Sequence, residues 1–276
     1  MKKNTVAAEQ KNEKRFGFGK NWLNFITTLD DQRINVAIES IKEKLNVDSL
    51  EGKTFLDIGC GSGLFSLAAR RMGAKVVSFD YDKNSVACAQ EIKKKFYNDD
   101  SDWIIMQGSA LDKEFIQSLG KFDIVYSWGV LHHTGDMWTA LEYADLAVKP
   151  GGTLFISLYN NQGRMSKVWL KVKQAYCSLP SYLRFIVVLP SGAVLWGPNF
   201  LRDFLRLTPF KSWTEYKKNR GMSAYHDLID WVGGLPFEVS TPEEIFRYYR
   251  DKGYSLKELK TCRGGLGCNE FVFGKK

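Results

Sequence analysis

A glycine-rich segment beginning at Gly59 has the residue types and spacing of a small-molecule site. Gly59, Gly61 and Gly63 follow a short apolar run and precede a helical pattern. Glycines let a ligand approach the backbone, and the first turn of a helix offers it unsatisfied N–H groups. The spacing therefore predicts a small-ligand site where a strand turns into a helix.

Two acidic residues narrow the chemistry of this site. Asp80 ends the next apolar run, 21 residues after Gly59, where a carboxylate can accept both hydroxyls of a ribose. Asp57 stands two residues before Gly59. It would repel a pyrophosphate, but it can hold an ammonium group directly or through water. The pair therefore favours a positively charged nucleoside with an amino-acid tail over a dinucleotide.

A parallel sheet is needed to bring these side chains together. Short apolar runs alternate with helical patterns up to about residue 160, which predicts such a sheet with helices packed on it. Near the C-terminus we expect a helix that begins with a capping box at Thr241, followed by a hairpin. The expected strands are 54–58, 75–80, 103–107, 122–127, 153–157, 254–261 and 269–273.

Five segments, in this order, resemble the motifs of class I S-adenosylmethionine-dependent methyltransferases. They are DIGCGSG from Asp57, the acidic Asp80, GSALD, FDIVYSWGVLHH and KPGG, and they cover about residues 50–160. The resemblance implies an α/β, Rossmann-like seven-stranded sheet with an antiparallel final strand and a helical insertion after the fifth strand. It also implies an enzyme that takes its methyl group from S-adenosyl-L-methionine.

The resemblance further implies which residues hold this cofactor. Gly59 and Gly61 would flank the methionine part, Asp57 would lie near its amino group, and Asp80 would bind the ribose. The adenine would pack on an aromatic ring and meet two small residues at its edge, and the backbone after the fourth strand would receive the amino group. These last positions are Tyr81 for the ring, Ser109 and Ala110 for the edge, and Trp128 for the backbone. Each residue taken alone also has a structural interpretation, as a turn cap, a helix start or a core aromatic.

Three histidines are the candidate catalytic bases. Methyl transfer to a hydroxyl needs alignment of the acceptor and removal of its proton, and histidine can take a proton near neutral pH. His133 is preferred, because its counterpart in the family often points into the cleft. His132 is the second candidate, and a purely structural role for both stays open. His226 is either another base or a substrate ligand.

The expected acceptor contacts lie outside the cofactor motifs. Arg220 could pair with an anionic group, and His226 and Asp227 follow it in a polar, glycine-containing segment. The aromatic and glycine-rich segment around Trp22 is either a lid over the cofactor or an anchor for the N-terminal helix. The expected organisation is a lid and helix at 1–49, a cofactor-binding core at 50–160, a basic, aromatic insertion at 161–240, and a helix and hairpin at 241–276.

Positive charge is concentrated in the insertion. Residues 164–220 hold eleven Lys and Arg against Asp203 and Glu215, whereas the whole chain has a net charge of +8. Such a segment can meet an anionic small molecule, a phospholipid surface or nucleic acid, or can simply be solvated. The uncharged stretch 185–201 is 17 residues long, and we expect its two prolines and two glycines to interrupt any helix there. We therefore expect no transmembrane segment, and peripheral membrane contact stays open.

The sequence also bears on whether the protein uses a metal ion and on the cellular compartment in which it works. Members of the family that use a divalent metal carry acidic residues just before the histidine after the fourth strand, whereas Gly-Val-Leu precedes His132 here. We therefore expect no metal. The polar N-terminus and the odd number of scattered cysteines favour a cytoplasmic protein without disulfides.

Outside the cofactor motifs, the chain is loosely similar to polyprenyl-quinone O-methyltransferases and to small-molecule methyltransferases associated with polysaccharide synthesis. We expect an O-methyltransferase of a small hydroxylated acceptor, such as a sugar or a phosphorylated or lipid-linked metabolite. Two alternatives stay open: an RNA or protein methyltransferase that docks through the basic insertion, and a non-catalytic, cofactor-binding partner subunit. Against a nucleic-acid partner, the basic residues are interleaved with apolar runs and prolines.

Overall fold

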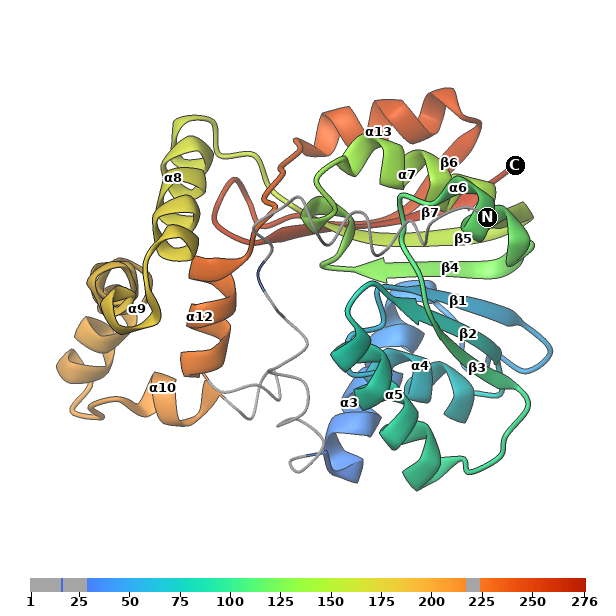
Figure 1. Cartoon of the computed structure of the whole chain (residues 1–276), viewed down its shortest axis with the longest axis horizontal. Coiled ribbons are helices and arrows are strands. Elements are labelled where there is room, and N and C mark those ends of the chain that lie inside the picture. The colour runs from blue at the N-terminus through green and yellow to red at the C-terminus, as the bar shows by residue number, and fades with distance from the viewer. Residues whose placement is uncertain (1–15, 17–28, 217–223) are drawn as a thin grey trace. The chain divides into compact units, whose positions relative to one another are not determined.

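The computed structural model describes residues 16, 29–216 and 224–276, and it divides the chain into two compact units (Figure 1). Among the described residues, the first unit comprises 29–162 and Pro236–Lys276. The second unit comprises Phe16 and the described part of Gly163–Leu235.

The first unit is built on a seven-stranded sheet. Its strands are β1 (Thr54–Ile58), β2 (Lys75–Asp80), β3 (Trp103–Gln107), β4 (Phe122–Trp128), β5 (Val148–Tyr159), β6 (Tyr254–Lys260) and β7 (Cys268–Lys275). The order across the sheet is β3-β2-β1-β4-β5-β7-β6, as can be followed in Figure 1. Neighbours among β1 to β5 are parallel, and β7 runs antiparallel between β5 and β6. This topology confirms the predicted fold class.

Helices cover both faces of this sheet (Figure 1). One face carries α6 (Lys113–Ser118), α7 (Met137–Leu146) and α13 (Pro242–Asp251), and the other carries α3 (Asp31–Leu45), α4 (Leu64–Arg71) and α5 (Lys83–Phe96). Successive strand residues point to opposite faces. Phe55 of β1 therefore lies in the core under α3, α4 and α5, and Leu56 lies in the core under α6, α7 and α13. Burial on both faces explains why the parallel strands appear as continuous apolar runs in the sequence.

The start of β5 differs from the prediction. The sequence predicted a strand at 153–157, but β5 begins at Val148, and its pairing with β4 has a register shift. Gly151, with φ +75°, lies in this irregular part. Such a bulge interrupts the two-residue alternation by which a strand is detected, and glycine adopts this backbone conformation without steric cost.

The capping box predicted for α13 is present. The Thr241 hydroxyl accepts the Glu244 N–H at 3.3 Å, and the Glu244 carboxylate accepts the Thr241 N–H at 2.8 Å. Pro242 occupies the first helical position, where its missing N–H costs nothing. These contacts set where the chain begins α13 before it returns to the sheet through β6 and β7.

The second unit is helical. Its elements are α8 (Arg164–Ser178), η2 (Ser181–Leu183), α9 (Phe185–Leu205), α10 (Lys211–Thr214) and α12 (Ala224–Gly233). A small core around Tyr176 of α8 and Leu228 and Val232 of α12 also takes in apolar residues of α9. Phe16 packs on Tyr176, with ring centroids 6.4 Å apart, and its N–H donates to the Leu235 carbonyl.

The prediction that prolines and glycines interrupt 185–201 is wrong. α9 runs through Pro190 and Pro198 for 21 residues. Each proline removes one backbone donor, and packing of α9 against α8 and α12 offsets this loss. By length and composition alone, the helical stretch Ser181–Leu205 could cross a membrane, and it is the one such stretch in the described residues; 6% of its most apolar window is buried.

Candidate active site

The predicted site residues of the first unit lie at one edge of the sheet. Gly59 follows β1, Asp80 ends β2, Ser109 follows β3 and His133 follows β4. β1 pairs with β2 on one side and with β4 on the other, so the strand order reverses between β1 and β4. In open parallel sheets, ligands bind outside the carboxyl ends of the strands at such a reversal.

The glycine loop after β1 has a backbone that other residues rarely adopt. Gly59 and Gly61 have φ of +74° and +54°. The N–H groups of Gly59 and Cys60 both donate to the Phe79 carbonyl, at 2.8 and 3.0 Å, which ties the loop to β2. A Cβ on Gly59 would lie 2.3 Å from the Val130 side chain. The loop after β4 thus packs directly against Gly59, and only glycine fits there.

Asp80 is positioned by the backbone around it. One carboxylate oxygen accepts the Gly61 N–H at 2.9 Å, and the other accepts the Asp82 N–H at 2.8 Å. Burial raises the pKa of Asp80 to about 6. The two backbone hydrogen bonds lower this pKa, but their effect is smaller than that of burial. The carboxylate is therefore held beside the glycine loop, at the end of β2.

Asp57 ends a chain of buried hydrogen bonds. The Trp103 indole N–H donates to the Ser78 hydroxyl at 2.9 Å, Ser78 donates to the Ser66 hydroxyl at 2.7 Å, and Ser66 donates to Asp57 Oδ2 at 2.5 Å. The chain connects β3, β2, α4 and β1, and it fixes the orientation of the carboxylate. Burial raises the pKa of Asp57 to about 7, and the charge of Asp80 contributes in the same direction. The site thus holds a buried and a half-buried carboxylate that repel each other.

The predicted adenine contacts lie at the ends of β2 and β3. Ser109 and Ala110 are both buried. The Ser109 hydroxyl accepts the Leu111 N–H at 3.1 Å, so this serine also organises the turn after β3. The Gln107 side-chain N–H donates to the Tyr81 carbonyl at 3.0 Å, which joins the ends of the two strands.

Trp128 ends β4, next to the glycine loop. Its indole N–H donates to a Glu270 carboxylate oxygen at 3.2 Å, and the other oxygen of Glu270 lies 3.2 Å from the Lys44 ammonium. The backbone turns at Gly129, whose N–H donates to the Ser157 carbonyl at 3.2 Å. Trp128 is thus anchored to α3 and β7 at the position where the resemblance expects a backbone contact to the cofactor.

His133 lies in a short helical turn after β4, η1 (Leu131–His133), and is half-buried. Its Nδ1 is 2.6 Å from the Pro236 carbonyl oxygen. A carbonyl oxygen only accepts hydrogen bonds, so Nδ1 carries the hydrogen and the neutral ring keeps its basic lone pair on Nε2. This is the tautomer of an anchored general base.

His132 is surrounded differently. It is fully buried, and its ring lies 3.9 Å from that of Tyr159 and 4.4 Å from that of His133, measured between centroids. Its Nδ1 accepts the Tyr159 N–H at 3.3 Å. These contacts lock His132 between β5 and His133.

A segment at 236–240, which returns from the second unit, is fastened to this histidine turn. The Glu238 N–H donates to the His132 carbonyl at 3.0 Å. The Glu238 carboxylate accepts the N–H groups of Gly135 at 3.2 Å and Met137 at 3.0 Å, so it satisfies backbone donors at the start of α7. The segment therefore determines the position of the loop that carries His133.

The sequence placed Pro236 and Glu238 in a segment that could be either a site loop or an ordinary capped loop, and it assigned neither residue a role of its own. Phe237 between them packs on Tyr159, with ring centroids 5.4 Å apart, and the Ser240 N–H donates to the Tyr159 carbonyl at 3.0 Å. The one sequence feature that could have pointed to these residues was a carboxylate next to apolar residues, just before the capping box of α13. The partners lie about 100 residues away in the chain, so no local pattern identified them.

Of the predicted acceptor contacts, the structure describes the side chain of Asp227 alone, and that residue belongs to the second unit. Trp22 and Arg220 lie outside the described residues, as do the predicted lid and helix before Leu29 apart from Phe16. His226 lies in α12, and its side chain is likewise outside the description. Asp227, also in α12, accepts a hydrogen bond from the Tyr216 hydroxyl within the second unit.

Across residues 16, 29–216 and 224–276, the structure contains no group of three or more His, Cys, Asp or Glu that could hold a metal ion. The expectation of a metal-independent site stays a prediction.

A family model described as a methyltransferase domain matches residues 30–191. The mitochondrial ubiquinone biosynthesis O-methyltransferase of Dictyostelium discoideum is 32% identical over 243 residues, which cover 83% of this chain and 66% of the relative. The ubiquinone biosynthesis O-methyltransferase of Brucella melitensis is 31% identical over 133 residues, covering 46% of this chain and 52% of the relative. The chain thus spans about half to two thirds of the length of these curated relatives.

Solved structures share the fold at low sequence identity. PKMT2 from Rickettsia typhi has a TM-score of 0.56 at 15% identity and covers 95% of this chain and 54% of its own. Magnesium protoporphyrin IX methyltransferase from Synechocystis PCC 6803, solved with bound SAH, has a TM-score of 0.51 at 16% identity and covers 89% of this chain and 83% of its own. At these identities the likeness bears on the fold alone.

Proposed function

Since this chain belongs to the class I S-adenosylmethionine-dependent methyltransferases, we propose that it methylates a hydroxyl of a small acceptor. The methyl group comes from S-adenosyl-L-methionine, and the methyltransferase domain is matched over residues 30–191. One observation carries the proposal: the glycine loop with Asp57 and Asp80 lies at the same sheet edge as His133 in its Nδ1–H tautomer. The names of the matched relatives, ubiquinone biosynthesis O-methyltransferases, support oxygen as the methylated atom.

The residues at this edge fit the proposed donor. When bound, S-adenosyl-L-methionine supplies a methyl group on a positively charged sulfur, and its tail carries an ammonium group. A nearby cation stabilises the charged forms of Asp57 and Asp80, whose pKa values burial has raised. Asp80 at the end of β2 suits the ribose hydroxyls, and Gly59 and Gly61 leave the backbone open to the methionine part.

The chain's own contribution to the chemistry is positioning and proton removal. His133 Nε2 takes the acceptor's hydroxyl proton while Nδ1–H stays on the Pro236 carbonyl, which favours the positive charge that the ring gains. His132 and Tyr159 hold the ring in place by packing. We assign proton transfer to His133 and positioning to His132, because His132 is fully buried.

The acceptor is proposed to be an anionic or lipid-linked hydroxylated metabolite. The second unit supports this class, because its exposed apolar residues on α9 are accompanied by Arg202, Arg206 and Lys211. An apolar surface with neighbouring cations suits a molecule with a hydrophobic part and an anionic group.

Calorimetric titration of the full chain with S-adenosyl-L-methionine and with its demethylated product tests the donor site. We expect both ligands to bind and Asp80→Asn to weaken both, whereas the exposed control Asp48→Asn should bind like the wild type. Absence of binding heat with folded wild-type protein would refute the donor assignment.

The acceptor is tested by incubating the chain with methyl-labelled donor and with lipid, aqueous and macromolecular fractions of a cell extract. We expect label in a small molecule, as an O-methyl group identified by NMR of the purified product. Label found only in RNA or protein would contradict the proposed acceptor class.

A further inference from the structure

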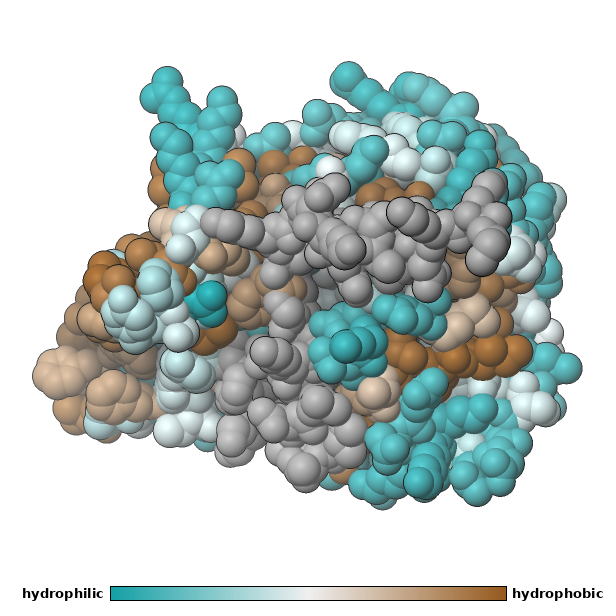
Figure 2. Space-filling model, in the orientation of Figure 1, coloured by the Kyte–Doolittle hydropathy of each residue, from teal (hydrophilic) through white to brown (hydrophobic). Residues whose placement is uncertain are grey.

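The second unit exposes an apolar stripe along α9. Phe185, Leu189, Val194, Leu201 and Leu205 have 55%, 67%, 63%, 61% and 73% of their surface accessible. Phe185 and Leu189 lie on a different row of the helix from Val194, Leu201 and Leu205, so these side chains spread over a broad part of the helix surface along about 30 Å; we call this surface the stripe. Figure 2 shows hydrophobic residues, in brown, at the surface in the region where Figure 1 places α9. Soluble proteins rarely expose a continuous apolar patch of this length without a binding role.

Another part of the surface of α9 already forms the core of the second unit. Val187, Val188 and Leu195 pack with Tyr176 of α8 and Val232 of α12. Folding of this unit therefore uses part of the surface of α9 and leaves the apolar stripe uncovered by the described residues.

The same packing argues against α9 as a membrane span. α8 precedes α9 and α12 follows it, and these two helices pack on each other as well as on α9. A spanning α9 would place α8 and α12 on opposite sides of a bilayer and would break these contacts. The arrangement is compatible with α9 lying along an interface, with the stripe on its outer side.

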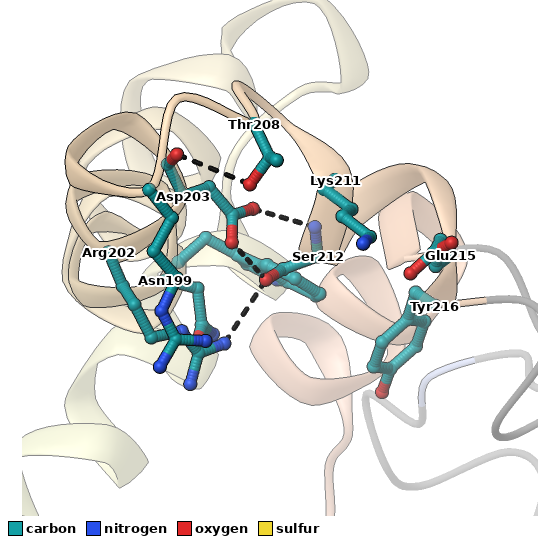
Figure 3. Close-up of a pocket in the computed structure, with 10 residues that line it drawn as sticks. Asn199, Arg202, Asp203, Thr208, Lys211, Ser212, Glu215 and Tyr216 are labelled. Carbon is teal, nitrogen blue, oxygen red and sulfur yellow. Dashed lines mark hydrogen bonds between the residues drawn. The ribbon is translucent and has the colours of Figure 1, made fainter.

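Beside the last turns of α9 lies a basic pocket of about 460 Å³ (Figure 3). Its cationic residues are Arg202, Arg206 and Lys211. Arg202 donates to the Ser212 hydroxyl at 3.1 Å, and Asp203 accepts the N–H and the hydroxyl of Ser212 at 2.6 and 2.7 Å. These bonds, dashed in Figure 3, close the turn between α9 and α10 and fix the pocket next to the stripe.

We propose that the second unit docks on a bilayer that contains anionic phospholipid. The stripe of α9 enters the interface, and Arg202, Arg206 and Lys211 bind lipid phosphates. Residues 164–220 hold eleven Lys and Arg against two acidic residues, so this segment complements a negatively charged bilayer surface. Interfacial helices of this kind bury their apolar face about 5–10 Å deep. Docking uses the surface that also supports the proposed acceptor class, but vesicle binding can be measured without donor or acceptor, so the two proposals can fail separately.

Vesicle co-sedimentation of the full chain tests this proposal. The probes are vesicles of phosphatidylcholine alone and vesicles in which part of it is replaced by phosphatidylserine. We expect the wild type to sediment with the anionic vesicles and much less with the neutral ones. No sedimentation with either kind of vesicle, from folded protein, would overturn docking.

Two pairs of matched variants separate the apolar and the charged contributions. Leu189→Glu should weaken vesicle binding at least ~10-fold, because a charge enters the apolar face; Val36→Glu, at a comparably exposed position of α3, should not. Arg206→Gln with Lys211→Gln should weaken binding about 30-fold at low salt. Lys94→Gln with Lys260→Gln removes the same charge from the first unit and should have little effect.

Circular dichroism and donor binding establish that each variant is folded. Equal effects of test and control variants would show non-specific adsorption and overturn the proposal. A wild-type dimer in sedimentation velocity that Leu189→Glu converts to a monomer, without any vesicle binding, would identify a second copy of the chain as the occupant of the stripe and would also overturn it.

Discussion

A hydrogen bond to a distant carbonyl favours one tautomer of His133. Its Nδ1–H donates to the Pro236 carbonyl, 103 positions further along the chain, and the ring therefore keeps its lone pair on Nε2. A ring without this anchor could present either nitrogen. The carbonyl thus performs the orienting role that a carboxylate has in many catalytic histidine pairs.

Replacing His133 by Ala is expected to lower kcat by about 10²- to 10⁴-fold, the typical contribution of a positioned base. Donor affinity should not change, because the glycine loop after β1, where we propose that the donor binds, is held by β2. Initial rates of labelled-methyl transfer and calorimetric donor affinity measure the two effects separately. Unchanged turnover in a folded His133→Ala protein would exclude it as the base.

The raised pKa values of Asp57 and Asp80 predict how donor affinity depends on pH. In the free protein, the pKa of Asp80 is about 6 and that of Asp57 is about 7. A cationic donor favours the ionised carboxylates, so donor binding releases protons below these pKa values. Donor affinity should therefore rise with pH, by as much as about 10-fold per pH unit for each proton released. Above about pH 7 it should level off.

Calorimetry at a series of pH values checks this dependence. Asp57→Asn should reduce the slope between pH 6 and 7, because one of the two titrating groups is gone. The exposed control Asp48→Asn should keep it. A donor affinity that is flat across this range would contradict the assignment of the two carboxylates to the donor site.

At the scale of elements, the turn from β1 into α4 depends on glycines. Gly61 has φ +54°, and its N–H donates to Asp80. Gly61→Ala should lower the free energy of unfolding by about 1 kcal/mol, the cost of a left-handed backbone with a Cβ. Gly61→Ala should also lower donor affinity by more than its loss of stability accounts for, because the alanine side chain enters the space expected for the donor.

Gly120→Ala is the matched control for this loop. Gly120 also has a positive φ, of +84°, but a Cβ there meets nothing within 4 Å. Its stability loss should be similar and its donor affinity unchanged. Thermal melts and calorimetry on both variants make the comparison, and equal donor affinity of the two variants would remove Gly61 from the donor site.

The elements themselves were largely predictable. The strands of the sheet appear in the sequence as short apolar runs because they are buried on both faces, as Phe55 and Leu56 of β1 illustrate. The capping box at Thr241 and Glu244 is a local pattern and was found from spacing alone. The continuation of α9 through Pro190 was not predictable from the sequence, because packing on other helices outweighs the local helix-breaking tendency of proline.

At the scale of the whole molecule, each unit has its own core, and the second unit has a buried lysine in its core. Lys173 of α8 has no accessible surface. Its ammonium lies 4.7 Å from the ring centroid of Trp231 and donates to the Trp231 carbonyl. Burial lowers the pKa of Lys173 to about 7. Between about pH 7 and the pKa of 10.5 of an exposed lysine, the unfolded chain therefore binds more protons than the folded one.

The stability of the second unit should consequently rise as the pH increases from 7 towards 10. Lys173→Met keeps most of the packed volume and removes the titrating group, so it should abolish this rise. Thermal melts followed by tryptophan fluorescence, to which Trp231 and the other tryptophans of the second unit contribute, measure the trend. A wild-type and a Lys173→Met protein with the same pH dependence would show that Lys173 is not responsible for it.

That Asp57, Gly59 and Asp80 meet at one edge of the sheet was predictable from sequence, whereas the sequence placed no such constraint on the expected acceptor contacts. Asp57, Gly59 and Asp80 stand next to strand ends, so an ordered parallel sheet necessarily gathers them at one edge. Arg220 and Trp22 were chosen without such a constraint, and they lie outside the described residues.

By itself, the sequence determined the α/β sheet and the edge at which its glycines and acids meet, because these follow from local periodicity and from the direction of parallel strands. Only the tertiary structure decided the His133 tautomer, the hydrogen-bond chain that orients Asp57, and which face of α9 is left exposed. Each of these depends on contacts between residues far apart in the chain, and side-chain spacing along the sequence does not encode such contacts.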